Sequence, residues 1–254
     1  MDHFAMNGKW LLFLTLWLPV MARAENCCSG TADGGANGDK VWAFKLTPSY
    51  YSTTHQQSAF DLNLRANQGP HAVWLGYYQR GNEFDQVRTG YELTLESEYG
   101  RLVPSLQLAT HDFAGGAVNL EVGHTVYALL GYGRTNAKDY YNLNFDPNDS
   151  VVYGLGTRLL PQTNLSAYTV RDNRLHTEQA ITHWVARIEL AEGQRLTLDR
   201  FDKHGRETPD DPKVSGHGLA LTYDFPSFFI RVARDRKVNF SNEDQNRIAL
   251  GIRF

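Results

Sequence analysis

Hydrophobic and polar positions alternate with a period of two along most of this chain. From residue 40 onward, short segments with this pattern are separated by residues that favour turns. In one segment Phe60, Leu62 and Leu64 share a face, and the residues between them are polar. The pattern predicts fourteen strands, at 40–48, 57–66, 71–79, 87–97, 101–110, 116–123, 125–134, 150–160, 164–172, 178–190, 194–202, 214–224, 227–236 and 245–254. Most have roughly the 9–11 residues that a tilted strand needs to cross a lipid bilayer.

The last predicted strand shows the two faces most clearly. Its sequence, QNRIALGIRF, places Ile248, Leu250, Ile252 and Phe254 on one face and two arginines on the other. In a soluble protein the apolar face would contact a core, whereas in a membrane barrel it would contact lipid. The terminal Phe254 on such a strand resembles the assembly signal of bacterial outer-membrane β-barrel proteins. The resemblance implies an all-β, antiparallel, up-and-down transmembrane barrel, similar to small porin-like channels.

The predicted connections alternate in length. Short connections are predicted at 67–70, 97–100, 123–124, 161–164, 191–194 and 224–227, and longer polar ones at 48–57, 79–86, 134–149, 202–213 and 237–244. Short periplasmic turns and longer outer loops are typical of outer-membrane barrels. The boundary at Gly123-His124 is the weakest. If the first pair of strands lies outside the wall, or two segments merge elsewhere, the count becomes twelve. We expect one barrel domain over 40–254.

The N-terminal segment predicts secretion. An apolar run of about eleven residues from Trp10 is followed by Ala22-Arg23-Ala24, so residues 1–24 have the pattern of a signal peptide cleaved after Ala24. Residues 25–39 form a Gly-rich polar tail, which we expect to be flexible. The tail holds Cys27 and Cys28, whose spacing does not choose between a vicinal disulfide, an intermolecular link, a partial metal site and no role.

Composition agrees with a barrel whose strands face both lipid and water. The net charge is −3 and aromatic residues make up 12% of the chain, while the mean hydropathy is only −0.44. A membrane protein is this hydrophilic when its spanning elements are strands. The charge gives no reason to expect nucleic acid as a partner. Candidate residues for the aromatic girdles at the membrane interfaces are Trp42, Trp74, Tyr91, Tyr132, Tyr153, Trp184 and Tyr223.

The charged face of the strands is predicted to line the barrel lumen, because a charge facing lipid costs on the order of 2–4 kcal/mol. The predicted lumen-lining residues are Arg65, Arg88, Glu92, Glu121, Arg158, Arg187, Glu189, Arg195, Asp199, Arg231, Asp235 and Arg247. Two interpretations remain open. The charges could form cross-strand ion pairs that close the bore, or they could line a polar channel for an anionic or sugar-like solute. The near balance of signs argues against strong anion selectivity.

Enzyme and metal motifs are weak. Ser215 and His217 share one strand face but lack the order of known outer-membrane lipid hydrolases, and His183 and His217 have no metal-ligand spacing. The longest predicted loop holds Asn144, Asp146, Asn148 and Asp149, which could bind Ca²⁺ or form an ordered loop that folds into the lumen. We expect no catalytic residues, no cofactor and no metal.

The sequence therefore predicts an outer-membrane barrel acting as a narrow passive channel for small polar or anionic solutes. One alternative is an accessory barrel for envelope biogenesis or polysaccharide export, with a filled lumen. A second is a lipid-modifying enzyme. The expected partners are outer-membrane lipid and lipopolysaccharide, the barrel-assembly machinery, which would recognise Phe254, and a small polar solute.

Overall fold

The computed structural model describes residues 41–141 and 146–254. The predicted signal peptide (1–24), the tail (25–39) with Cys27 and Cys28, and Asn144 lie outside the described residues. Among the residues that are described, no helix is long and apolar enough to cross a membrane. The regular structure consists of strands and one 3₁₀ turn, η1 (Val238–Phe240).

In residues 41–141 and 146–254, fifteen strand segments form one sheet. They are β1 (Ala43–Thr53), β2 (Ala59–Gln68), β3 (His71–Arg80), β4 (Phe84–Leu93), β5 (Leu95–Ser97), β6 (Gly100–Ala109), β7 (Phe113–Gly123), β8 (Val126–Thr135), β9 (Val151–Thr157), β10 (Thr163–Asp172), β11 (Gln179–Ala191), β12 (Gln194–Gly205), β13 (Val214–Asp224), β14 (Phe228–Asp235) and β15 (Gln245–Arg253). Thr94 separates β4 from β5, and both pair with β6. They therefore occupy one position in the wall.

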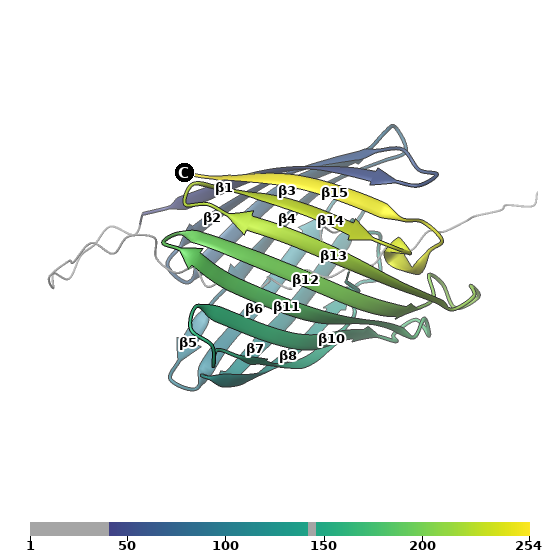
Figure 1. The fold of residues 1–254 in the computed structure, drawn as a ribbon. Coiled ribbons are helices and arrows are strands. Elements are labelled where there is room, and N and C mark those ends of the chain that lie inside the picture. Colours follow the sequence, from purple (N-terminus) through teal and green to yellow (C-terminus); the bar gives the residue numbers. More distant parts are fainter. Residues whose placement is uncertain (1–40, 142–145) are drawn as a thin grey trace, which may run out of the picture.

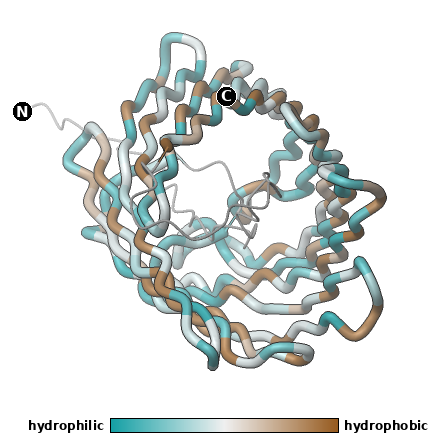
Figure 2. The backbone as a smooth tube through the Cα atoms, turned by 90° about the vertical axis from the view of Figure 1, so that its left-hand side faces the viewer, coloured by the Kyte–Doolittle hydropathy of each residue, from teal (hydrophilic) through white to brown (hydrophobic). Residues whose placement is uncertain are grey.

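The sheet closes on itself as an antiparallel barrel (Figures 1 and 2). Each strand pairs with its neighbours in the chain, and β1 pairs with β15, where Tyr50 lies opposite Ile248. With β4 and β5 sharing one position, the fifteen segments make a fourteen-stranded wall. The predicted up-and-down barrel of fourteen strands is confirmed. Twelve is wrong because β1 and β2 lie inside the wall, with β1 pairing with β15, and the boundary near Gly123 is a turn between β7 and β8.

The connections differ between the two ends of the barrel. The short-turn end has connections at 69–70, 98–99, 124–125, 158–162, 192–193 and 225–227, and the long-loop end has them at 54–58, 81–83, 110–112, 136–150, 173–178, 206–213 and 236–244. The predicted loops at 48–57 and 79–86 are shorter than expected, because β1 continues to Thr53 and β4 begins at Phe84. The longest connection, 136–150, joins β8 to β9.

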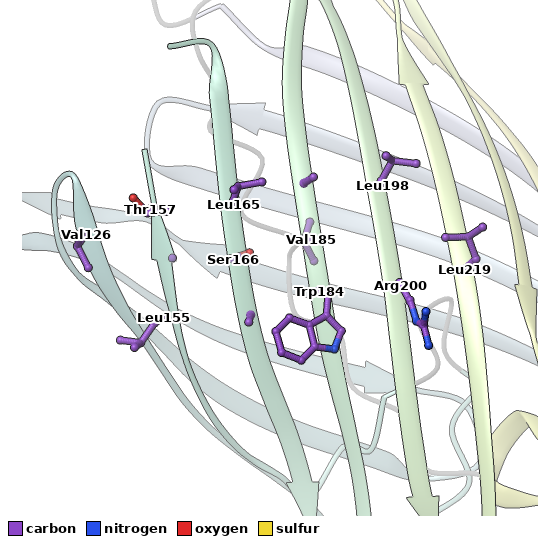
Figure 3. A pocket seen from close by; sticks show the side chains of 13 residues that line it. Val126, Leu155, Thr157, Leu165, Ser166, Trp184, Val185, Leu198, Arg200 and Leu219 are labelled. Atoms are coloured by element: carbon purple, nitrogen blue, oxygen red, sulfur yellow. The ribbon is translucent and has the colours of Figure 1, made fainter. Parts of the chain in front are cut away.

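The outward face of the wall is apolar. In β3 and β15 exposed and buried residues alternate without interruption, and the exposed positions include Val73, Leu75 and Leu250. Figure 3 shows part of this face, where Leu165, Trp184 and Leu198 line a shallow groove with Arg200 beside it. A continuous apolar surface around a barrel is larger than the patches that soluble monomers expose. It suits a lipid environment.

The inward face carries aromatic rings that lie over glycines of the neighbouring strand. A Cβ on Gly156 would lie 2.1 Å from the Tyr127 ring, and one on Gly251 would lie 1.8 Å from the Phe229 ring. Trp74 packs in the same way over Gly90, and only 6% of its surface is exposed. Its assignment to an interfacial girdle is therefore wrong, since the missing side chain at position 90 makes room for an inward indole.

Candidate functional site in the barrel interior

Ion pairs on the inward face join strands that lie on either side of a shared neighbour, as β2 and β4 lie on either side of β3. Arg65 contacts both carboxylate oxygens of Glu92, at 3.1 and 2.5 Å. Arg158 pairs with Glu121, donates to the backbone oxygen of His124 at 2.8 Å, and lies over the Tyr127 ring. These four predicted residues therefore neutralise each other in pairs, as charge-assisted, partly bidentate contacts.

One deeply buried pair joins Arg88 to Asp61. Their side chains are 2% and 0% exposed. Arg88 also donates to the backbone oxygen of Tyr141, at 2.6 Å. Since Tyr141 belongs to the 136–150 connection, this arginine ties that connection to the wall.

The 136–150 connection enters the barrel. Tyr141 stacks on Tyr78 with ring centroids 3.4 Å apart and meets Tyr51 edge to face, while Tyr140 stacks on Phe113 at 4.2 Å. Burial raises the pKa of Tyr140 to about 12 and raises the pKa of Tyr141 well above its usual value. Both phenols are therefore neutral packing groups, and this part of the interior is filled.

A second set of contacts holds the other end of this connection. His183 lies between Asp146 and Asp199, with one ring nitrogen 2.9 Å from each carboxylate. His183 therefore links Asp146 of this connection to Asp199 on the neighbouring strand β12.

Asp149 has partners of its own. It accepts from the backbone N–H of Thr135 at 2.7 Å and pairs with Arg174 at 2.7 Å. Asp146 and Asp149, which the sequence suggested as calcium ligands, thus contact different protein groups. No cluster of metal-ligating side chains occurs among the described residues.

Asp235 pairs with Lys203 at 2.5 Å, and both side chains are fully buried. The ammonium of Lys203 lies 5.7 Å from the ring centroids of Phe201 and of Phe240 in η1. Lys203 was not among the predicted lumen-lining residues because the predicted strand ended at residue 202, whereas β12 continues to Gly205.

Acids also gather near the short-turn end. Asp224 pairs with Arg253 and, at 3.3 Å, with Arg195. Glu189 lies 3.9 Å from Arg195, with 46% of its side chain exposed. This glutamate sits next to the register shift near the end of β11, so it lies at the rim of the wall.

Three predicted arginines have other surroundings. Arg231 donates from Nε to Thr222 at 2.9 Å, and Arg247 lies over the Tyr51 ring. Arg187 is half-buried on β11, between Asn164 and Thr197 of the adjacent strands.

Lys45 also lies on the inward surface, between Arg65 and Arg253, although it was not among the predicted lumen-lining residues. Its alternation with Thr47 and Ser49 on β1 was the available signal.

Phe254 lies at the seam between the first and last strands. Its backbone N–H donates to Phe44 at 3.0 Å, and its carbonyl accepts from Phe44 at 2.7 Å. The two rings stack with centroids 5.8 Å apart on the outward face. Phe254 therefore completes the pairing that closes the barrel.

The comparisons with known proteins reveal shared architecture. No protein-family model and no curated protein matches the sequence. The outer membrane protein Omp33 of Acinetobacter baumannii is similar in structure, with a TM-score of 0.55, 10% identity, and coverage of 84% of this chain and 98% of that one. The match to OprD of Pseudomonas aeruginosa covers 84% of this chain and 93% of OprD, with 7% identity and a TM-score of 0.45. The chain thus has the fold of an outer-membrane barrel.

Proposed function

We propose that this chain is a passive channel for small polar or anionic solutes. The observation that carries the proposal is a closed barrel with an apolar outward face and a charged inward face whose arginines are in part half-buried rather than fully packed. Such a wall separates lipid from a polar interior. The structurally similar Omp33 is described as an outer membrane protein.

The location that goes with this fold is the bacterial outer membrane. The outward leucines, valines and isoleucines then contact outer-membrane lipid and lipopolysaccharide, and the long-loop end faces outward from the cell. Phe254 is the part of the chain that the barrel-assembly machinery would engage.

Ion conductance in planar lipid bilayers tests the channel directly. Purified, refolded protein should give discrete current steps in KCl, and vesicles containing it should swell when small neutral sugars or anions enter. Heat-denatured protein from the same preparation is the control. Absence of current and of swelling from correctly folded protein would refute the channel.

The accessory barrel with a filled lumen remains the second candidate, and one observation favours it. The 136–150 connection fills part of the interior through Tyr140, Tyr141 and Asp146. An accessory barrel would give no conductance even when folded, so the same experiment separates the two candidates.

The lipid-modifying alternative has less support. Ser215 and His217 are both exposed on the outward face of β13, and no hydrogen bond joins them in the part of the chain that is described. Asp202, which lies opposite His217 on β12, pairs instead with Arg200. A nucleophile, a base and an orienting acid in contact are what such chemistry requires.

A further inference from the structure

Most carboxylates of the inward face form ion pairs with specific cations. Glu92, Asp61, Glu121 and Asp235 each contact one cation of the wall, and Asp146 and Asp199 share His183. The near balance of positive and negative residues in the sequence therefore does not describe the electrostatic field at each place in the lumen. What matters is which cations are left without an acid.

Lys45 and Arg231 are two such cations. Neither forms an ion pair with a carboxylate anywhere in the described chain, and both are half-buried. Arg231 is oriented by its Nε bond to Thr222, so its two terminal nitrogens are not held by that bond. Arginine and lysine donors placed in this way are available to a bound group.

Both cations lie near the Phe229 ring. The Lys45 ammonium and the Arg231 guanidinium each lie 5.9 Å from its centroid, on strands β1 and β14. The Arg253 guanidinium lies 5.5 Å from the same ring. The Phe229 ring lies over Gly251, where a Cβ would come within 1.8 Å of it.

The local charge is positive after pairing. The cations are Lys45, Arg65, Arg195, Arg231 and Arg253. The nearby carboxylates are Glu92, held by Arg65, Asp224, held by Arg253 and Arg195, and Glu189, 3.9 Å from Arg195. Five positive and three negative charges leave two positive charges. Lys45 lies in the repulsive field of Arg65, Arg231 and Arg253, and this repulsion is relieved when a negative charge binds.

Building on the channel proposed above, we propose that Lys45 and Arg231, flanking Phe229, form a binding site for a small oxyanion with two negative charges, such as a phosphate or a dicarboxylate. The arginine fork contacts two oxygens of such a group, and the lysine ammonium contacts a third. A monovalent anion would neutralise only half of the excess charge.

The site is tested by calorimetric titration of detergent-solubilised full-length protein with inorganic phosphate, succinate, and glucose as a neutral probe. Lys45→Gln and Arg231→Gln each remove one positive charge at similar side-chain length. Arg236→Gln, at an exposed position outside the strands, is the matched control with the same change in net charge. Heat-modifiable migration in gels verifies that each variant is folded.

The parent protein should bind phosphate, succinate or both at one site per chain, and should not bind glucose. Each site variant should bind about ten- to a hundredfold more weakly, since one charge-assisted interaction is lost. The Arg236→Gln variant should bind as the parent does. Phosphate binding without succinate binding, or the reverse, identifies which oxyanion the site takes.

Equal binding by the parent and by the folded Lys45→Gln/Arg231→Gln double variant would overturn the site, as would equal weakening in Arg236→Gln. This outcome is separable from failure of the channel. Binding that depends on Lys45 and Arg231 in a protein without conductance would support the site and refute the channel. Conductance without such binding would support the channel and refute the site.

Discussion

Replacing Arg88 by glutamine should destabilise the barrel strongly. Arg88 and Asp61 are 2% and 0% exposed, and Arg88 forms an ion pair with that carboxylate. The variant leaves a buried carboxylate without its cation, which costs about 3–5 kcal/mol. This corresponds to a change of roughly 10²–10⁴ in the unfolding equilibrium. It also removes the guanidinium that donates a hydrogen bond to the Tyr141 backbone oxygen.

The free energy of unfolding is measured by urea titration of protein folded into lipid vesicles, followed by tryptophan fluorescence. Arg200→Gln is the matched control, because Arg200 pairs with Asp202 at 3.3 Å while 66% and 49% of the two side chains are exposed. An exposed pair contributes less than about 1 kcal/mol. The double variant Asp61→Asn/Arg88→Gln should recover part of the loss, since it removes the unpaired charge.

Two results would refute this reasoning. One is an Arg88→Gln variant that is as stable as Arg200→Gln. The other is a double variant that is less stable than Arg88→Gln alone, because the cost would then come from lost packing and not from the unpaired carboxylate.

Three further outcomes are expected. Deleting Phe254 should lower the yield of heat-modifiable protein in the outer membrane, because the seam with Phe44 loses two hydrogen bonds and a ring contact; an unchanged yield would remove its role in assembly. In a cysteine-free background, Asp210→Cys on the long-loop end should react with an impermeant thiol reagent on intact cells and Glu192→Cys on the short-turn end should not; reversed labelling would invert the topology. Gly156→Val should cost about 1–3 kcal/mol in urea unfolding, because the new side chain overlaps the ring that covers this glycine; a stable variant would show that the ring moves freely.

The barrel could be predicted because its information is local. Alternation in segments such as 71–79 and 245–254 identifies strands one at a time, and turn residues separate them. Pairing with the nearest neighbour in the chain then gives the topology without any long-range information. The predicted strand ends were less accurate, and the extension of β12 to Gly205 is the reason that Lys203 was missed.

The interior could not be predicted to the same extent, because its contacts join residues distant in the sequence. His183 looks isolated along the chain, yet Asp146 and Asp199 approach it from a loop and from the neighbouring strand. Alternation gives the face of a side chain but not its partner. The excess of cations near Phe229 is likewise visible only after the pairs are known.

The flat aromatic rings over glycines have a consequence for how such a barrel can change during evolution. The backbone hydrogen bonds fix the circumference of the wall, whereas the free width inside it depends on how far side chains project. At Gly156 and Gly251 a ring occupies the space of an absent side chain and stays close to the wall. One substitution at such a position pushes a ring toward the axis without altering strand number or register. The inner profile, and with it the size limit for solutes, can therefore diverge among related barrels while the wall stays the same.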